Sequence, residues 1–218
     1  MFRTSQSWLL TLALILPAIL PATGAEEMKL GWAFGAMTGP ATARHFVRIT
    51  DDITLRTGDE IQMFVSPVTA CFIYVLHEDP AGEMTVLFPG TSGAFPPGYG
   101  IDKPFYVPAA KAWLRLDSDT GMERVYLVAS PQRLTQLETL LNQSRTAGDA
   151  RARRNRVVGE LARLTKQNPS SWAERPATIG GQIRGVPRTK PAYPDLAELA
   201  VEITSPGFFS RVFVIEHR

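Results

Sequence analysis

The sequence predicts a mainly β protein, an antiparallel β-sandwich with a two-helix appendage. Short apolar segments separated by turn residues fill residues 30–124, a spacing typical of two packed sheets rather than of alternating strands and helices. At Ser130 the spacing of apolar residues changes from two to three or four, which indicates helices. An aromatic and β-branched segment at residues 208–215 then indicates a final strand that returns to the sheet.

The first half of the chain contains the clearest strand patterns. Residues 60–66 carry apolar side chains at every second position, as in a strand with one buried face. Residues 71–76 are apolar on both sides, as in a central strand. The turn residues 79–82 and the apolar residues 84–88 complete an antiparallel hairpin. A strong strand pattern also lies at 123–129, and shorter ones lie at 32–37, 46–49, 105–108 and 113–116.

Two helices are expected at about residues 131–167. Ser130 suits an N-cap and Pro131 suits the first helical position, and leucines then recur every three or four residues. A second amphipathic pattern covers residues 149–167 and ends at Asn168-Pro169. We expect a helical hairpin inserted into a single domain of residues 26–218, followed by a Pro/Gly-rich loop at about 176–195.

The first 25 residues have the three parts of a secretory signal peptide. Arg3 gives a positive end, residues 8–20 are almost wholly apolar, and residues 22–25 are small. This apolar run of about 13 residues is shorter than the ~20 of a membrane-spanning helix. We therefore expect cleavage after Ala25 and a soluble periplasmic or secreted chain, with an uncleaved anchor as the alternative.

The composition excludes several classes of protein. With 44% hydrophobic and 20% charged residues, the chain is expected to be globular rather than disordered. The net charge of +2 gives no global attraction to nucleic acid, and no phosphate-loop motif indicates a nucleotide. Cys71 is the only cysteine, so an intramolecular disulfide is excluded, and its apolar strand predicts a buried thiol.

No motif in the sequence requires catalysis, a metal or a cofactor. Residues 90–94 lack the last glycine of a serine hydrolase elbow. The three histidines, His45, His77 and His217, are far apart in sequence, and His77 and Glu78 should point to opposite faces of a strand. Residues 117–121 begin like a calcium loop, but Val128 stands where the bidentate glutamate is required. We expect no catalytic residue, no metal and no cofactor.

Two groups of side chains are candidate binding surfaces. Residues 145–166 contain seven basic residues against Asp149 and Glu160, which predicts a helix with a positive outer face that could bind a protein partner or an anionic lipid surface. The alternative is an ordinary solvated face. The second group consists of aromatic residues near a Pro-rich loop, and its alternative role is to cover the sandwich edge. The candidate residues are Arg151, Arg153, Arg154 and Arg156 of the helix, and Phe95, Tyr99 and Trp113.

Residues 54–130 resemble a bacterial family, the domain-of-unknown-function family 4384. Its five short motifs occur here in the expected order, as Leu55 to Asp59, Tyr74-Val75, Leu87-Phe88-Pro89, Gly121-Met122-Glu123 and Tyr126 to Ser130. The resemblance implies an all-β exported or envelope-associated module and no established catalytic residue. Within the first motif, Gly58 can take a positive φ at a turn and Asp59 can bond nearby amides, so both have a structural explanation.

The expected function is therefore a non-catalytic interaction or adaptor module in a bacterial envelope assembly. Its expected partner is an envelope or periplasmic protein, and neither nucleic acid nor a nucleotide is expected. A sensor for a small ligand or a glycan is the first alternative, and an uncharacterised hydrolase is the second.

Overall fold

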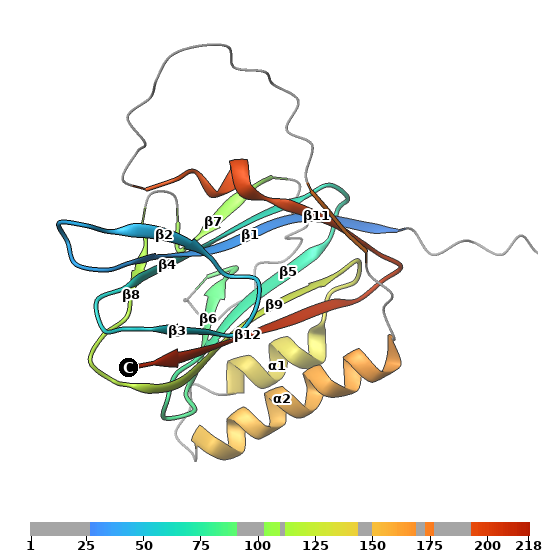
Figure 1. Ribbon diagram of the computed structural model, residues 1–218. Coiled ribbons are helices and arrows are strands. Elements are labelled where there is room, and N and C mark those ends of the chain that lie inside the picture. Colours follow the sequence, from blue (N-terminus) through green and yellow to red (C-terminus); the bar gives the residue numbers. More distant parts are fainter. Residues whose placement is uncertain (1–26, 91–102, 110–111, 144–149, 169–172, 177–192) are drawn as a thin grey trace, which may run out of the picture.

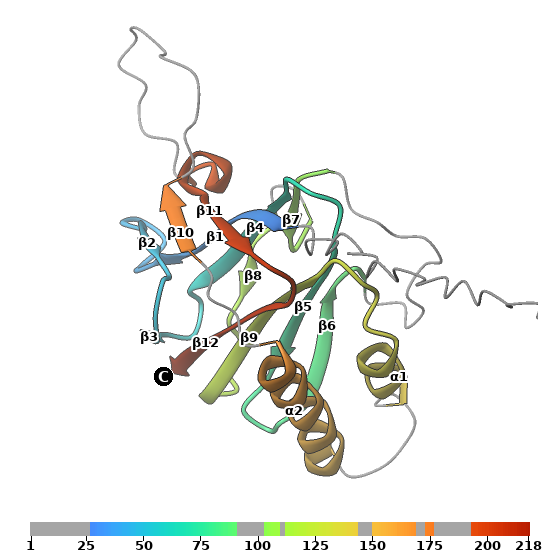
Figure 2. The same cartoon turned by 90° about the vertical axis from the view of Figure 1, so that its right-hand side faces the viewer.

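Two β-sheets pack face to face in the computed structural model, and two helices cover the outer face of one sheet (Figures 1 and 2). The structure describes residues 27–90, 103–109, 112–143, 150–168, 173–176 and 193–218. The predicted class, a β-sandwich with a helical appendage, is confirmed. Within these described ranges, no helix is long and apolar enough to cross a membrane.

The first sheet is built on the antiparallel pair β1 (Met28–Thr38) and β4 (Glu60–Pro67). Its strand order is β10-β11-β1-β4-β7, with β2 also paired to β1 and β8 also paired to β4. The remaining strands of this sheet are β2 (His45–Arg48), β7 (Phe105–Val107), β8 (Leu114–Arg115), β10 (Ala173–Pro176) and β11 (Val201–Ser205).

The second sheet has the strand order β3-β12-β9-β5-β6. The predicted hairpin is confirmed as the antiparallel pair of β5 and β6, and the predicted final strand is confirmed as β12, which pairs with β9 along its length. β3 pairs with β12 in parallel. The bounds are β3 (Ile53–Leu55), β5 (Phe72–Glu78), β6 (Met84–Phe88), β9 (Gly121–Ser130) and β12 (Phe209–His217).

The core between the sheets is apolar and rich in aromatic rings. Trp32 and Phe34 of β1 point inward and pack on Phe213 of β12, with ring centroids 5.3 and 5.0 Å apart. Burial of each such ring contributes roughly 2–3 kcal/mol. Cys71 is also buried in this core, as predicted.

The helices α1 (Thr135–Gln143) and α2 (Ala150–Gln167) bury their leucine and valine stripes on the outer face of the second sheet, against Tyr74 and Tyr126 (Figure 2). The prediction that α1 begins directly after Ser130 is wrong. β9 continues through Ser130, which pairs with Phe72, and the Ser130 hydroxyl accepts a hydrogen bond from the Gln132 amide in the turn that follows.

The expected loop at residues 176–195 is followed by two elements that were not predicted from the sequence, the 3₁₀ helix η1 (Leu196–Leu199) and β11. Leu196 packs on Ala33 and Phe64, on the outer face of the first sheet. Residues 177–192 of that loop and the expected signal peptide, residues 1–25, lie outside the described residues.

Candidate functional site

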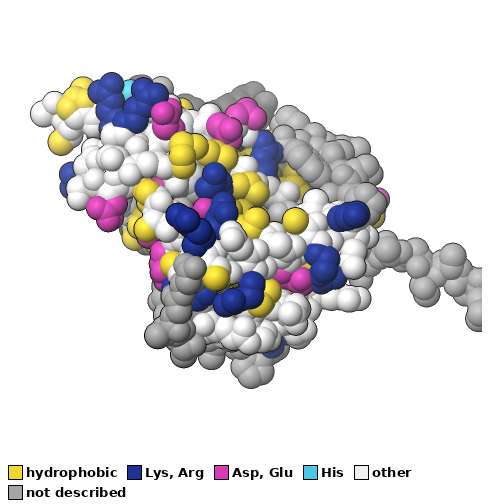
Figure 3. Space-filling model, turned by 90° about the horizontal axis from the view of Figure 1, so that it is seen from below, with side chains coloured by type: hydrophobic (Ala, Val, Ile, Leu, Met, Phe, Trp, Pro, Cys, Tyr) yellow, Lys and Arg dark blue, Asp and Glu magenta, His cyan; other side chains and the backbone are white. Residues whose placement is uncertain are grey.

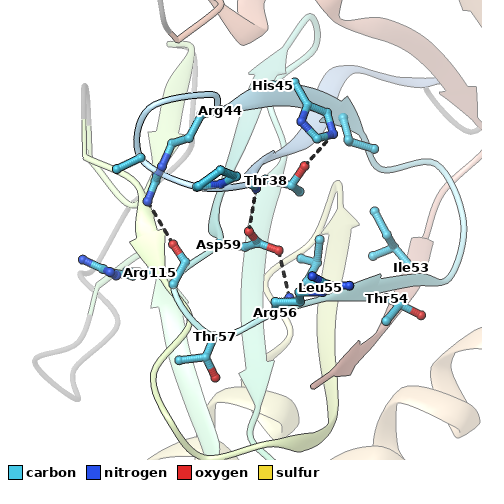
Figure 4. A pocket seen from close by; sticks show the side chains of 15 residues that line it. Thr38, Arg44, His45, Ile53, Thr54, Leu55, Arg56, Thr57, Asp59 and Arg115 are labelled. Atoms are coloured by element: carbon cyan, nitrogen blue, oxygen red, sulfur yellow. Dashed lines mark hydrogen bonds between the residues drawn. The ribbon is translucent and has the colours of Figure 1, made fainter.

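A cleft lies between β2 of the first sheet and β3 of the second, and we call it the β2–β3 cleft (Figure 4). Its volume is 780 Å³, which is within the range of ligand-binding pockets. It is lined by residues 38–41, 44, 45, 47, 53–59 and 115. The walls therefore come from segments that are far apart in sequence.

The turn at residues 55–59 fixes the shape of the cleft. Gly58 has a φ of +89°, which a residue with a side chain rarely adopts. The buried Asp59 carboxylate accepts hydrogen bonds from the Gly39 amide at 3.1 Å and from the Arg56 amide at 2.8 Å, so it joins two walls of the cleft (Figure 4). The structural roles predicted for Gly58 and Asp59 are confirmed.

The cleft carries an excess of positive charge. Arg44 forms an ion pair with Glu60 at 2.6 Å and donates to the Gly58 carbonyl at 3.0 Å. Arg56 and Arg115 are exposed, and no hydrogen bond or ion pair joins their side chains to any other described residue. Asp59 is the one carboxylate among the described residues that line the cleft, and both of its oxygens already accept backbone hydrogen bonds. Two guanidinium groups are thus available to an anionic ligand.

A buried polar cluster links Thr57, at the edge of the cleft, to the ends of three strands. The Thr57 hydroxyl lies 3.1 Å from His217 Nε2, and His217 Nδ1 lies 2.7 Å from Glu123 Oε1. His77 Nε2 lies 2.6 Å from Glu123 Oε2. His217 and Glu123 are almost fully buried, so these hydrogen bonds satisfy groups that would otherwise be costly to bury.

No local sequence pattern connects these residues, because His77 and His217 are 140 positions apart in sequence and meet only through the sheet. β5 and β12 are both neighbours of β9, which carries Glu123. The prediction that His77 and Glu78 point to opposite faces of their strand is confirmed. His77 bonds Glu123, whereas Glu78 bonds Tyr126 on the face that the helices cover. Among the described residues, no group of three or more His, Cys, Asp or Glu is arranged to hold a metal ion.

The order of hydroxyl, imidazole and carboxylate in this cluster is that of a hydrolytic triad. Hydrolysis also requires donors for the developing oxyanion. The amides of Thr57, Gly58 and Asp59 donate to the carbonyls of Arg218, Leu116 and Arg56. The turn that carries the hydroxyl therefore has no backbone amide to offer a substrate oxygen.

The positive charge of the basic helix α2 is partly neutralised by acidic residues on β5 and in the β5–β6 turn. Arg153 pairs with Glu83 at 3.0 Å, and Arg154 pairs with Glu78 at 2.9 Å. Arg151 and Arg156 are exposed. The expectation of a face opposed by Asp149 and Glu160 alone is corrected, because Glu78 on β5 and Glu83 in the turn before β6 also neutralise arginines of the helix. Figure 3 shows acidic side chains among the basic ones on this side of the molecule.

The aromatic candidates do not join the helix in one site. Trp113 is half-buried on the first sheet, and its ring lies 5.4 Å from that of Tyr193. Phe95 and Tyr99 lie outside the described residues. Trp113 therefore contributes to the packing around η1, on the side of the sandwich away from α2.

Comparison with known families supports one of the sequence-based expectations directly. Residues 54–133 match the model of a family described as Domain of unknown function (DUF4384), which confirms the predicted resemblance. The matched segment includes β3 except Ile53, the turn at residues 55–59, Arg115 and Glu123, whereas β2 and His217 lie outside it. No curated protein and no solved structure matches the chain.

Proposed function

We propose that this chain is an exported, non-catalytic binding module that holds an anionic partner in the β2–β3 cleft. The segment that matches the DUF4384 model builds one wall of this cleft. The availability of Arg56 and Arg115 carries the proposal. Both guanidinium groups lie at a concave surface, without a partner among the described residues, next to Arg44 and His45. Charge of one sign in a concave site attracts ligands of the opposite sign.

Export is proposed from the amino-terminal sequence. The positive end, the short apolar run and the small residues up to Ala25 are the three parts of a secretory signal peptide, and the small residues provide the cleavage site. The mass of the mature protein, purified from the periplasm of an expressing bacterium, is expected to correspond to a chain that begins at Glu26. A chain that keeps Met1 in the membrane fraction would contradict the proposal.

A hydrolase is the second candidate, because Thr57, His217 and Glu123 have the order of a triad. In that case the Thr57 oxygen would attack an ester carbonyl, and His217 would accept the hydroxyl proton and return it to the leaving alcohol; water would then release the acid by the same route. A p-nitrophenyl ester assay separates the two candidates. Turnover by the wild-type chain that is lost in Thr57→Val would support hydrolysis, and equal background rates support the binding module.

The binding site is tested by copurification from the periplasm with two matched variants. Arg56→Gln/Arg115→Gln removes two positive charges from the cleft, and Arg151→Gln/Arg156→Gln removes two from the exposed face of α2. We expect the first variant to lose the partner of the wild-type chain and the second to keep it. If instead the first variant keeps the partner and the second loses it, the basic helix is the surface that binds the protein partner or the anionic lipid. Retention of the partner by both variants would contradict both sites.

A further inference from the structure

We propose that the ligand of the β2–β3 cleft is an extended acidic peptide whose backbone pairs with the outer edge of β3. This inference rests on the proposed function and adds the chemical class of the partner. It assigns carboxylate recognition to Arg56 and Arg115, and backbone recognition to Thr54. Addition of a peptide strand to an open sheet edge is a common mode of peptide recognition.

Both strands that flank the cleft are edge strands in the described part of the chain. β2 pairs with β1 alone, and β3 pairs with β12 alone. An edge strand presents backbone N–H and C=O groups that another chain can bind. The cleft is therefore bordered by backbone hydrogen-bonding groups as well as by arginine side chains.

The lining of the cleft favours β3 over β2 as the docking edge. Successive side chains of a strand point to opposite faces of the sheet. If one face of a strand borders a cleft, only every second residue of that strand lines the cleft. His45 and Val47 of β2 follow this rule, and β2 thus contributes a face. Ile53, Thr54 and Leu55 line the cleft consecutively, so β3 contributes its edge.

The backbone hydrogen bonds of β3 identify the open groups. The Leu55 carbonyl accepts from the Arg218 amide, and the Thr57 amide donates to the Arg218 carbonyl, so the backbone groups of residues 55 and 57 point toward β12. Because these directions alternate along a strand, the N–H and C=O of Thr54 point to the opposite side. No described backbone group bonds them.

The chemistry of these groups favours a peptide over a small anion. An ionised phosphate or carboxylate accepts hydrogen bonds from arginine and from the Thr54 N–H, but it has no donor for the Thr54 carbonyl. A peptide residue supplies both a donor and an acceptor. Side chains at alternate positions of the peptide would place carboxylates near Arg56 and Arg115, and the residues between them would meet the apolar side chains of Val47 and Ile53.

The experiment measures fluorescence anisotropy with labelled hexapeptides and the full chain. The probe alternates valine with glutamate, and its controls replace glutamate by lysine or methylate alternate backbone amides. We expect the acidic probe to bind, and both controls to bind at least tenfold more weakly. Binding should weaken as salt rises, because screening acts on the exposed arginines.

Two substitutions at Thr54 separate backbone pairing from side-chain effects. Thr54→Pro removes the open N–H from an edge strand, where proline is tolerated, whereas Thr54→Val keeps the N–H and removes only the hydroxyl that bonds Glu216. We expect Thr54→Pro to weaken the probe about tenfold relative to Thr54→Val. If the proline variant is unfolded by circular dichroism, the methylated probe gives the same comparison with the unaltered chain.

The outcomes separate this inference from the proposed function. If the methylated probe binds as well as the unmodified one, or if no acidic probe binds while Arg56→Gln/Arg115→Gln still loses the copurified partner, strand pairing is wrong and the binding cleft stands. If the cleft variant keeps its copurified partner, the proposed function is wrong whatever the peptides do.

Discussion

Substitution of Arg154 by glutamine should destabilise the protein, whereas the same change at Arg156 should not. Both residues are on α2, two positions apart, and both changes remove one positive charge. Arg154 bonds Glu78 of β5 at 2.9 Å, and Glu78 is 3% exposed. Arg156 is exposed and has no partner among the described residues. The pair therefore compares an arginine that attaches the helix to the sheet with one on its solvated face.

The magnitude follows from the other partners of Glu78. A hydrogen bond to a charged group contributes about 1.5–3 kcal/mol, and removal of the last partner of a buried charge costs about 3–5 kcal/mol. Glu78 keeps Arg124 at 3.0 Å and the Tyr126 hydroxyl at 2.6 Å. Burial, and then the hydrogen bond to Glu78, raise the pKa of Tyr126, so this donor stays protonated. Since Glu78 stays partnered, we expect a loss of about 1–2 kcal/mol for Arg154→Gln, and less than about 0.5 kcal/mol for Arg156→Gln.

Urea and thermal denaturation of the two variants and the wild-type chain measure this difference. A loss of about 1–2 kcal/mol lowers the Tm of a chain of this size by about 2–8 °C. A double-mutant cycle with Glu78→Gln should give a coupling between residues 78 and 154 and none between 78 and 156. Equal stability of the Arg154 and Arg156 variants, or equal coupling of both to Glu78, would refute the assignment of Arg154 to helix attachment.

Three further predictions concern the core and the polar cluster. Burial raises the pKa of the Cys71 thiol to about 11, so a thiol reagent at pH 8 should label the folded chain far more slowly than the urea-unfolded chain; equal rates would show an accessible thiol. Gly35→Ala would place a Cβ 2.2 Å from the Phe46 ring, and the displaced ring should cost about 1–3 kcal/mol in urea denaturation; unchanged stability would show that the ring yields freely. Glu123→Gln replaces one of two imidazole-bound carboxylate oxygens by a donor and should cost about 1–3 kcal/mol. The same change at Glu216, whose side chain is 44% exposed, should cost much less, and equal losses would contradict the importance of the buried cluster.

Local patterns predicted the parts of the fold that local chemistry determines. The β5–β6 hairpin follows from apolar strands on either side of the turn residues Asp79, Pro80 and Gly82, and the turn amide of Gly82 does bond the Asp79 carbonyl. β11 was missed because it is a five-residue strand that follows a Pro/Gly-rich segment, and its partner β1 is far away in sequence. The start of α1 was misplaced because Ser130 has the composition of an N-cap but is used as a strand residue.

The β2–β3 cleft could not be found by local patterns. Its arginines come from residues 44, 56 and 115, which no periodicity connects. One local signal was present, the Leu-x-x-Gly-Asp turn, and its glycine and aspartate were correctly interpreted as structural. What the sequence does not contain is the pairing of β3 with the final strand, which places this turn opposite β2. The same limit applies to α2, whose neutralising acids lie on β5 and in the turn before β6.

Photo-crosslinking from two exposed alanines tests the binding cleft most directly. Ala41 lines the β2–β3 cleft, and Ala152 lies on α2. Each alanine is replaced by p-benzoylphenylalanine in the full chain. Each variant is irradiated in the periplasm and examined for an adduct with the copurifying partner. If the partner binds in the cleft, we expect an adduct from position 41 and none from position 152. The adduct from position 41 should disappear when Arg56→Gln/Arg115→Gln is added. An adduct from position 152 with none from position 41 would contradict the cleft as the binding site.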